Sequence, residues 1–305
     1  MSLAISPSPP ERRRGLAYVA LAVAVAGIVW SAFFVRWAKV PGATSALYRV
    51  LVASCVLVPW SAASWFSSSG RASGRCRINR TAGLYALLGG AFFGCDLALY
   101  NTAVLRTTAA NATLFGNNAP IFVGLGTWLL FRRRPRRAFW IGLGLSMSGA
   151  VVVMMNNMRS DGAAAGNTVG NLLALGAAMF FAGYMLTTER AREEMDTLTF
   201  SAISAIGSVV TLLVTCLLLD APLSAFTSRT WAALLGLGLV SQLGSYLALA
   251  YALGQLPATV SSVGLLAQVP LTALLAVPLL GEPITAPQIF GGLLVLAGIF
   301  VVNRP

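Results

Sequence analysis

The sequence has no histidine, only nine acidic residues among 305, and a charged fraction of 10%. Histidine is the commonest metal ligand and a frequent general base, so its absence removes parts that many hydrolytic and metal sites need. The chain also has neither a Walker-type phosphate loop nor a nucleophile elbow. We therefore expect no enzymatic activity, no catalytic residue, no metal site and no cofactor.

Hydrophobic residues are what the chain has in abundance. They make up 57% of the sequence, the mean hydropathy is +0.78, and the apolar residues fall in long runs without an amphipathic stripe. About 20 helical residues cross roughly 30 Å of hydrocarbon. The pattern predicts an all-α integral membrane protein with ten transmembrane helices: Leu16–Val35, Ala43–Ser64, Ala82–Ala103, Ala109–Leu130, Ala138–Met155, Val169–Thr187, Phe200–Leu219, Thr230–Leu253, Ala258–Leu280 and Thr285–Val302.

Two stretches that lie 150 residues apart carry the same pattern in unbroken register. Weaker matches link the first helix to the sixth and the fifth to the tenth. Five helices per half is an odd number, so the second half must enter the membrane from the opposite side, as in the inverted repeats of secondary transporters. We predict a first half at 1–158 and a second at 159–305. The matches are Gly94, Leu97, Ala98 and Leu99 with Gly244, Leu247, Ala248 and Leu249; Asn118 and Pro120 with Gln268 and Pro270; Ala26, Gly27 and Arg36 with Ala182, Gly183 and Arg192; and Gly142 and Gly149 with Gly291 and Gly298.

The formal charge of +12 could indicate a nucleic-acid partner, but the basic residues alternate by loop. If the N-terminus is cytoplasmic, the cytoplasmic segments hold 15 of the 21 basic residues and the opposite side holds five. This bias predicts a multi-pass protein of the cell inner membrane with both termini in the cytoplasm. The lipid bilayer is then the expected partner, and nucleic acid is not.

Several short motifs add a family resemblance that spans nearly the whole chain. The sequence resembles the EamA-type members of the drug/metabolite transporter superfamily, and among them it is most similar to the amino-acid exporters, including the YddG-type aromatic amino acid exporters. The resemblance implies ten helices, an inverted repeat and export of small metabolites. One departure is that the first half has Phe131-Arg132 where the second has Gly281-Glu282. The motifs are Tyr48-Arg49, the Pro120 and Pro270 helices, Gly281-Glu282, and Gln288, Gly291 and Gly298.

Asp96 is the only acidic residue that the predicted spans place well inside the membrane. A buried carboxylate is costly without a partner, so it commonly marks a solute or proton pathway. Tyr100 lies four residues on and hence on the same helical face. We expect Asp96 to bind a substrate ammonium or to carry a coupled proton; the alternative is a carboxyl group that only packs against a neighbouring helix.

The fourth and ninth predicted helices carry amides and a proline each. Amides both donate and accept hydrogen bonds, which suits a zwitterionic solute, and a proline frees a backbone carbonyl one turn earlier. The alternatives are hydrogen bonds between helices and kinks without gating. The amide candidates are Asn111, Asn117, Asn118 and Gln268, with Ser261 opposite Asn111, and the hinge candidates are Pro120 and Pro270.

Aromatic residues from corresponding helices are the remaining candidates for a substrate cavity. Apolar contact is non-directional, so an aromatic lining would accept side chains of many shapes; the alternative for each is packing or lipid contact. The candidates are Trp30, Phe181, Tyr184 and Tyr246. Arg49 lies close to the outer end of its helix, and we expect it to reach the membrane interface, with carboxylate binding as the lesser alternative.

These features together predict a secondary transporter that exports amino acids, neutral and aromatic ones included, by alternating access. The competing transport function is efflux of organic cations or drugs, for which Asp96 and aromatic residues would also suffice. A non-transport alternative is a membrane scaffold or sensor, which would not need inverted halves with matched polar residues. The sequence leaves the oligomeric state open, and a monomer is compatible with it.

Overall fold

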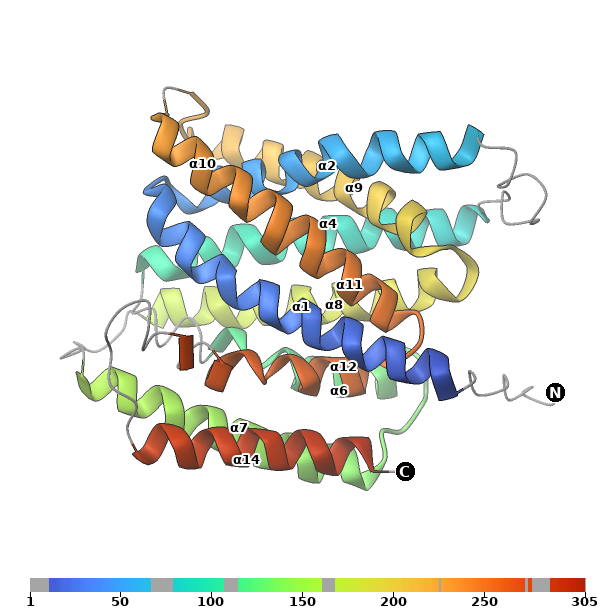
Figure 1. Ribbon diagram of the computed structural model, residues 1–305, viewed down its shortest axis with the longest axis vertical. Helices are drawn as coiled ribbons and strands as arrows, with labels where there is room; N and C mark the ends of the chain where they lie inside the picture. Colours follow the sequence, from blue (N-terminus) through green and yellow to red (C-terminus); the bar gives the residue numbers. More distant parts are fainter. Residues whose placement is uncertain are drawn as a thin grey trace.

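A computed structural model describes residues 11–66, 79–106, 115–160, 168–224, 226–271, 274–275 and 286–304, and its elements in this part are all helical (Figure 1). Long apolar sequences form helices in a membrane because every backbone N–H and C=O group must find its partner within the segment. The helices are α1 (Glu11–Ala38), α2 (Gly42–Phe66), α4 (Arg80–Arg106), α6 (Ala119–Leu129), α7 (Arg137–Ser160), α8 (Thr168–Glu194), α9 (Thr197–Leu218), α10 (Ser228–Gly236), η1 (Leu237–Gly244), α11 (Ser245–Leu253), α12 (Ala258–Leu265) and α14 (Ala286–Asn303).

The prediction of ten membrane helices is confirmed. In the described part, five helical segments are long and apolar enough to cross a membrane, and five shorter apolar helices accompany them. Two predicted spans are interrupted by turns. The expected Ala109–Leu130 helix has a turn at residues 117–118, and the expected Ala258–Leu280 helix has one at residues 266–267. The described part of the chain in and beside these two spans leaves out residues 107–114, 272–273 and 276–285.

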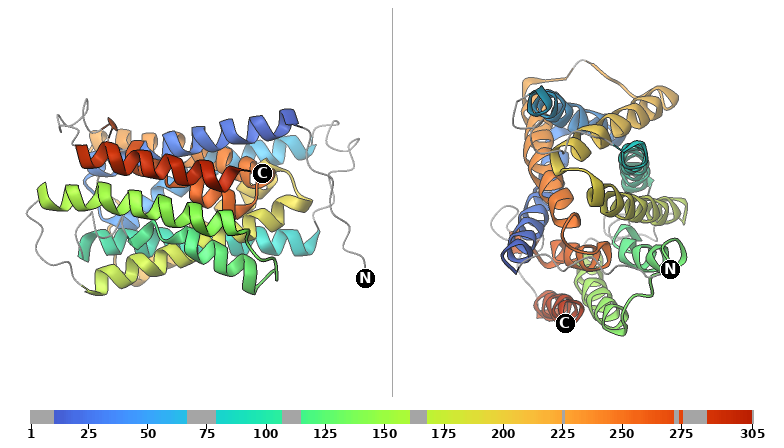
Figure 2. Two further views of the ribbon diagram at one scale, coloured as in Figure 1. Left: turned by 90° about the horizontal axis from the view of Figure 1, so that it is seen from below. Right: turned by 90° about the vertical axis from the view of Figure 1, so that its right-hand side faces the viewer.

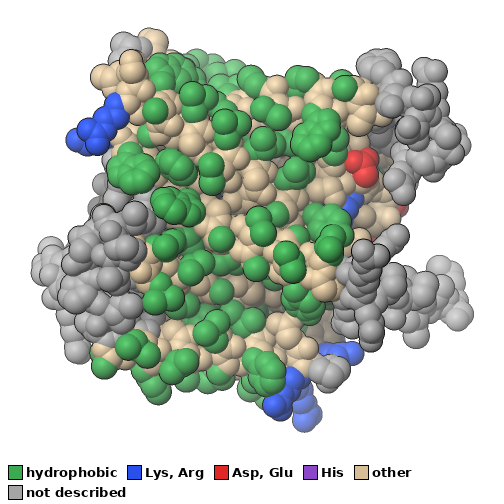
Figure 3. Space-filling model, viewed as in Figure 1, with side chains coloured by type: hydrophobic (Ala, Val, Ile, Leu, Met, Phe, Trp, Pro, Cys, Tyr) green, Lys and Arg blue, Asp and Glu red, His purple; other side chains and the backbone are tan. Residues whose placement is uncertain are grey.

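Hydrophobic side chains cover the outward surfaces of the helices. On the face shown in Figure 3 they extend from one end of the bundle to the other, and the charged side chains visible there lie toward the two ends. Large apolar residues are strongly exposed on these faces, such as Leu218 at 79% and Leu129 at 69%. Such surfaces would be unfavourable in water and match contact with lipid.

The packing of the helices follows an inverted repeat. The α4 helix packs mainly on α8, while its counterpart α10–η1–α11 packs on α1, the counterpart of α8. The α7 and α14 helices lie side by side at one edge of the bundle (Figure 2). A Cβ at Gly142 would meet the carbonyl of Gly298, and one at Gly149 would meet that of Gly291. Exchanging the two halves turns one contact into the other, which is the signature of a two-fold axis between the halves.

The connection between α9 and α10 fixes the start of α2. Thr44 Oγ1 donates to the carbonyl of Pro222 at 2.9 Å, and the Tyr48 hydroxyl donates to that of Leu223. The Tyr48 ring also packs edge-on against Trp231, with centroids 5.2 Å apart. These contacts hold the first turns of α2, and Arg49 on the next position, against the second half of the chain.

The start of α9 is capped by Asp196. Its carboxylate accepts hydrogen bonds from the backbone N–H groups of Leu198 and Thr199 at 3.0 and 3.1 Å. Burial acts to raise the pKa of Asp196, but the hydrogen bonds from Thr199 and Leu198 outweigh it and hold the pKa below its ordinary value. An ionised carboxylate at this position stabilises the helix N-terminus.

Candidate functional site

A π-helical segment interrupts the eighth membrane helix at its centre. Residues Leu237–Gly244 form η1 between α10 and α11, and Ser245 Oγ donates to the carbonyl of Val240, five residues back, at 3.1 Å. A Cβ at Gly238 would meet Val52, so η1 lies closely on α2. Single π turns within α-helices occur frequently at functional sites because they redirect side chains. Here the segment carries Gln242 toward Arg49.

Arg49 is buried at the centre of this contact, with 7% of its surface exposed. Its Nε donates to Gln242 Oε1 at 2.7 Å and its Nη1 donates to Ser31 Oγ at 3.0 Å. The guanidinium lies over the ring of Tyr246, 5.2 Å from its centroid. The expectation that Arg49 reaches the interface is therefore wrong. Its side chain turns inward because Gln242, Ser31 and an aromatic face supply partners within the bundle.

Asp96 and Arg49 bring opposite charges to the same place. Asp96 is half-buried on α4, one turn from Phe93, whose ring lies 4.6 Å from that of Tyr246, and the Arg49 guanidinium lies over the same Tyr246 ring. Among the described residues the Asp96 carboxylate forms neither a hydrogen bond nor an ion pair within 4.0 Å. Asp96 and Tyr246, which the sequence singled out, thus lie near the same ring, whereas Tyr100 packs in another group with Phe115 and Leu173.

Aromatic rings continue this cluster across the bundle. Tyr184 stacks on Phe181 with centroids 5.9 Å apart and lies 6.2 Å from Tyr246. Phe93 lies between the two tyrosines, 5.0 Å from Tyr184 and 4.6 Å from Tyr246. Phe200 completes the group at 6.5 Å from Tyr184. Three of the four predicted aromatics, Phe181, Tyr184 and Tyr246, are therefore brought together.

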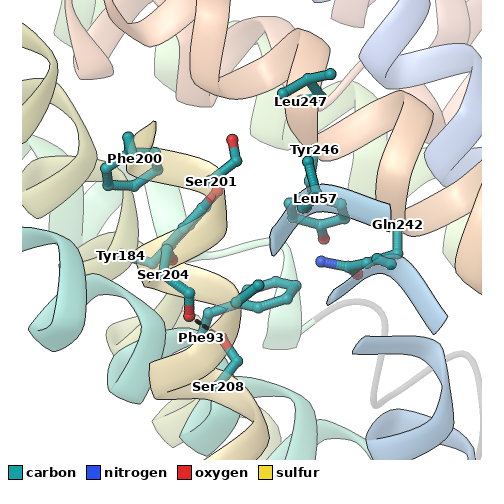
Figure 4. A pocket seen from close by; sticks show the side chains of 12 residues that line it. Leu57, Phe93, Tyr184, Phe200, Ser201, Ser204, Ser208, Gln242, Tyr246 and Leu247 are labelled. Carbon is teal, nitrogen blue, oxygen red and sulfur yellow. Dashed lines mark hydrogen bonds between the residues drawn. The ribbon is translucent and has the colours of Figure 1, made fainter. Parts of the chain in front are cut away.

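A small cavity of about 30 Å³ lies among these rings (Figure 4). Its wall is amphipathic, because Ser201, Ser204 and Ser208 of α9 and Gln242 of η1 face the same space as Phe93 and Tyr246. This volume holds about one or two water molecules and is far below the roughly 300 Å³ at which ligand pockets begin. The arrangement is that of a closed centre with a mixed aromatic and polar lining.

The predicted amides on the fourth and ninth membrane helices form a separate contact. Gln268 Nε2 donates to Asn117 Oδ1 at 3.0 Å and joins the two helix interruptions. Asn118 is the N-cap residue of α6, and its Nδ2 donates to the carbonyl of Phe115 at 3.0 Å. Pro120 lies in the first turn of α6, and Pro270 lies shortly after the turn at 266–267. The prolines thus follow the interruptions, as their missing N–H groups require; whether they act as hinges stays a prediction.

The remaining predicted positions are more scattered. Trp30 is half-buried on α1, and its ring lies 6.3 Å from that of Phe34 on the same helix. Ser261 is buried on α12. Asn111, Gly281 and Glu282 lie outside the described residues.

Sequence reasoning missed Gln242, Phe93 and the serines of α9. Gln242 had a detectable signal, since it is a polar residue in the middle of an apolar span. Phe93 and the serines had none, because aromatic and small residues are common throughout such helices.

A second hollow lies at the end of the bundle that holds Arg190. It measures about 340 Å³ and lies between the start of α4, the end of α6 and the end of α8. Arg190 lies over the Phe131 ring at 4.4 Å and forms an ion pair with Glu193 at 3.0 Å. Glu194 accepts from Asn79 Nδ2 at 2.7 Å. The wall is polar, so the hollow suits hydrated solutes near a membrane surface.

Comparison with known proteins agrees with this architecture. A protein of known crystal structure has the same fold, with a TM-score of 0.76 and 17% identity over 95% of this chain and 98% of that one. The uncharacterized transporter YwfM of Bacillus subtilis (strain 168) is 31% identical over 214 residues, which is 68% of this chain and 69% of that protein. The model of the EamA-like transporter family matches residues 13–155 and again 168–304. The chain therefore belongs to the EamA-like transporter family and is a multi-pass membrane transporter, not an enzyme.

Proposed function

We propose that this transporter exports amino acids, including neutral and aromatic ones, across the inner membrane by alternating access. The observation that carries the proposal is a guanidinium, Arg49, over the Tyr246 ring and a carboxylate, Asp96, one turn from Phe93, beside an aromatic and serine-lined cavity. A zwitterion needs one partner of each sign, and its variable side chain needs a tolerant apolar surface. The ammonium group is assigned to Asp96 and the side chain to Phe181, Tyr184 and Tyr246. Trp30 and Tyr100 are assigned to the rim of the same cavity.

Alternating access supplies the mechanism. The two halves, 1–158 and 159–305, rock about the central site, with Pro120 and Pro270 as hinges and the contact between Asn117 and Gln268 on the axis of movement. In this mechanism the small central cavity belongs to a step of the cycle in which the site has no room for a solute.

Efflux of organic cations is the second candidate, since Asp96 and the aromatic rings would bind a cation equally well. Counterflow into liposomes that contain the purified protein separates the two. We expect labelled neutral and aromatic amino acids to exchange and quaternary amines not to. Exchange of quaternary amines alone would replace amino-acid export with cation efflux, and exchange of neither class would leave the scaffold or sensor as the better explanation.

We further propose that both termini face the cytoplasm, because the arginines gather on that side. A cysteine at Arg134 should resist an impermeant thiol reagent in intact cells, while one at Arg229, on the opposite side, should react. Cys55, Cys76, Cys95 and Cys216 are replaced beforehand. The reverse pattern of labelling would invert the topology.

A further inference from the structure

The unusual feature of Arg49 is a buried charge without an ionic partner. Among the described residues no carboxylate lies within 4.0 Å of its guanidinium, and the single ion pair at that distance joins Arg190 and Glu193 at the surface. Arginine stays protonated in proteins, so the charge cannot be relieved by losing a proton. A charge buried in this way is expensive unless a partner completes it.

The hydrogen bonds of Arg49 leave one specific edge incomplete. The Nε–H and one Nη2–H of a guanidinium point in the same direction and together bind the two oxygens of a carboxylate. In Arg49 the Nε is occupied by Gln242 Oε1, while Nη2 is buried and forms no hydrogen bond of standard geometry with the described residues. The amide oxygen therefore occupies half of a carboxylate position. At the other half, Nη2 is buried without an acceptor of standard geometry among the described residues, and Tyr246 is the neighbouring polar side chain.

Gln242 links this edge to the cavity, because the residue that binds Arg49 Nε also lines the cavity. It lines the 30 Å³ space, and it belongs to the π-helical η1 segment. The residue aligned with Gln242 in the first half is Phe92, which has no amide and packs against Phe180 and Gly183 on α8. Rotation of the Gln242 amide would expose the Nε and Nη2 edge of Arg49 to a solute in the cavity.

We propose that Arg49 binds the carboxylate of the transported solute through its Nε and Nη2 edge, and that Gln242 occupies this edge in the empty, closed transporter. The inference deepens the proposed export of amino acids, on which it rests, by assigning the carboxylate recognition that Asp96 and the aromatic rings cannot supply. On this proposal every substrate must have a carboxylate, and that carboxylate displaces Gln242 from Arg49.

The two residues are tested by opposite changes at Gln242. Gln242→Glu places a carboxylate of the protein on Arg49, which competes with the solute, so the KM for a transported amino acid should rise at least about tenfold. Gln242→Leu removes the competitor, so KM should stay the same or fall. If the hydrogen bond between Gln242 and Arg49 only joins η1 to α2, Gln242→Leu would weaken this contact and Gln242→Glu would strengthen it. KM would then rise in Gln242→Leu and stay the same or fall in Gln242→Glu. That reversal overturns the proposal.

Arg49→Gln tests the arginine in liposome counterflow. We expect KM for the amino acid to rise at least about tenfold, whereas Arg229→Gln, at an exposed position on α10, is the matched control and should leave KM unchanged. Amines that correspond to the same amino acids without the carboxylate serve as competitors. They should compete at least about tenfold more weakly than the amino acid in the wild type, and this difference should vanish in Arg49→Gln. If that variant does not fold, Arg49→Lys and the Gln242 pair decide the question.

The outcomes also separate this inference from the proposed function. Amino-acid exchange that keeps its KM and its preference over the amine in Arg49→Gln would overturn the role of Arg49 and leave amino-acid export intact. If the wild type exchanges no amino acid but exchanges other monocarboxylates in an Arg49-dependent way, export of amino acids fails and the carboxylate site stands. Exchange of cations alone, unaffected by Arg49→Gln, would refute both.

Discussion

The third membrane helix and its counterpart, the eighth, share a sequence pattern but have different structures. The α4 helix is continuous over 27 residues, whereas Ser228–Leu253 is interrupted by the π-helical η1. On α4, glycines allow close packing, since a Cβ at Gly90 would meet the backbone of Ser204 on α9. The aligned residue in the other half is Val240, and its carbonyl accepts the hydrogen bond from Ser245. The repeat thus fixes where each helix lies, while local substitutions decide its internal geometry.

This difference divides the chemistry of the site between the halves. The regular helix supplies Asp96 at the position where its counterpart has Tyr246, and the interrupted helix supplies Gln242 where α4 has Phe92. An inverted repeat with two identical halves would offer a solute the same groups twice. The proposed zwitterionic solute has two different ends, and for such a solute identical groups at these positions would be a disadvantage.

The largest expected effect comes from removing the charge of Asp96. Asp96→Asn keeps the shape, and we expect amino-acid counterflow to fall at least about 100-fold, because a transported ammonium loses its counter-charge. Tyr246→Phe, its counterpart, keeps the ring and should reduce counterflow only a few-fold. Both variants are measured across the pH range in liposomes.

The comparison between the two halves fails if Tyr246→Phe reduces counterflow more than Asp96→Asn does. Full activity of Asp96→Asn with an unchanged pH profile would exclude both ammonium binding and proton coupling at this position. A severe loss in Tyr246→Phe alone would place the essential polar group in the second half.

A second comparison concerns the ends of α8 and α1, which the register between Arg192 and Arg36 relates. In α8, Glu189 Oε2 accepts the backbone N–H of Ala258 at the start of α12, at 2.9 Å. The equivalent position of α1 is Phe33, which has no acceptor. Glu189 therefore joins the sixth and ninth membrane helices at the end of the bundle that holds Arg190, and we infer that this bond helps to close that end.

Glu189→Ala should open that side. In a background without the native cysteines, a cysteine at Ala205 in the cavity wall reports access from either face of oriented vesicles. We expect labelling from the Glu189 side to rise about tenfold, since the loss of a hydrogen bond to a charged acceptor costs about 1.5–3 kcal/mol. Labelling from the other side should not rise. Glu193→Ala, at an exposed position on the same helix, is the control.

Unchanged labelling in Glu189→Ala would show that the contact caps α12 without closing the path. A rise in labelling from the opposite side would mean that Glu189 does not close its own end of the bundle.

Hydropathy and the repeat sufficed to predict the ten helices and their inversion, because both follow from one-dimensional patterns. Pro120 and Pro270 lie in the two helices that turns interrupt, whereas no proline marks the π-helical interruption of the eighth helix. The burial of Arg49 could not be predicted, since its partner Gln242 is 193 residues away and lies in a segment whose π geometry has no sequence signature. Proximity to the outer end of α2 indicated the interface, and tertiary contacts outweighed it. Of the predicted site residues, Phe181, Tyr184 and Tyr246 lie near one another in the structure, and their role in substrate binding stays a prediction.

The smallest expected effects come from the glycines at the two mirrored helix contacts. A Cβ at Gly27 on α1 would meet Ser245 Oγ, and one at the equivalent Gly183 on α8 would lie 2.9 Å from the Phe92 ring. Overpacking of this kind costs about 1–3 kcal/mol. Gly27→Ala should be the more destabilising of the two, because Ser245 Oγ is held by its bond to Val240 and can only move by giving up that bond.

Double-mutant cycles measured by the thermal unfolding of the purified protein test this order. Ser245→Ala should relieve much of the cost of Gly27→Ala, with a coupling of about 0.5–3 kcal/mol, and Phe92→Leu should relieve less of the smaller cost of Gly183→Ala. Additive effects at Gly27 and Ser245 would show that α1 does not lie against the π segment as closely as described. Equal coupling energies at both contacts would show that η1 adjusts to the added methyl group as easily as a regular helix. The two halves would then differ in helix geometry but not in rigidity.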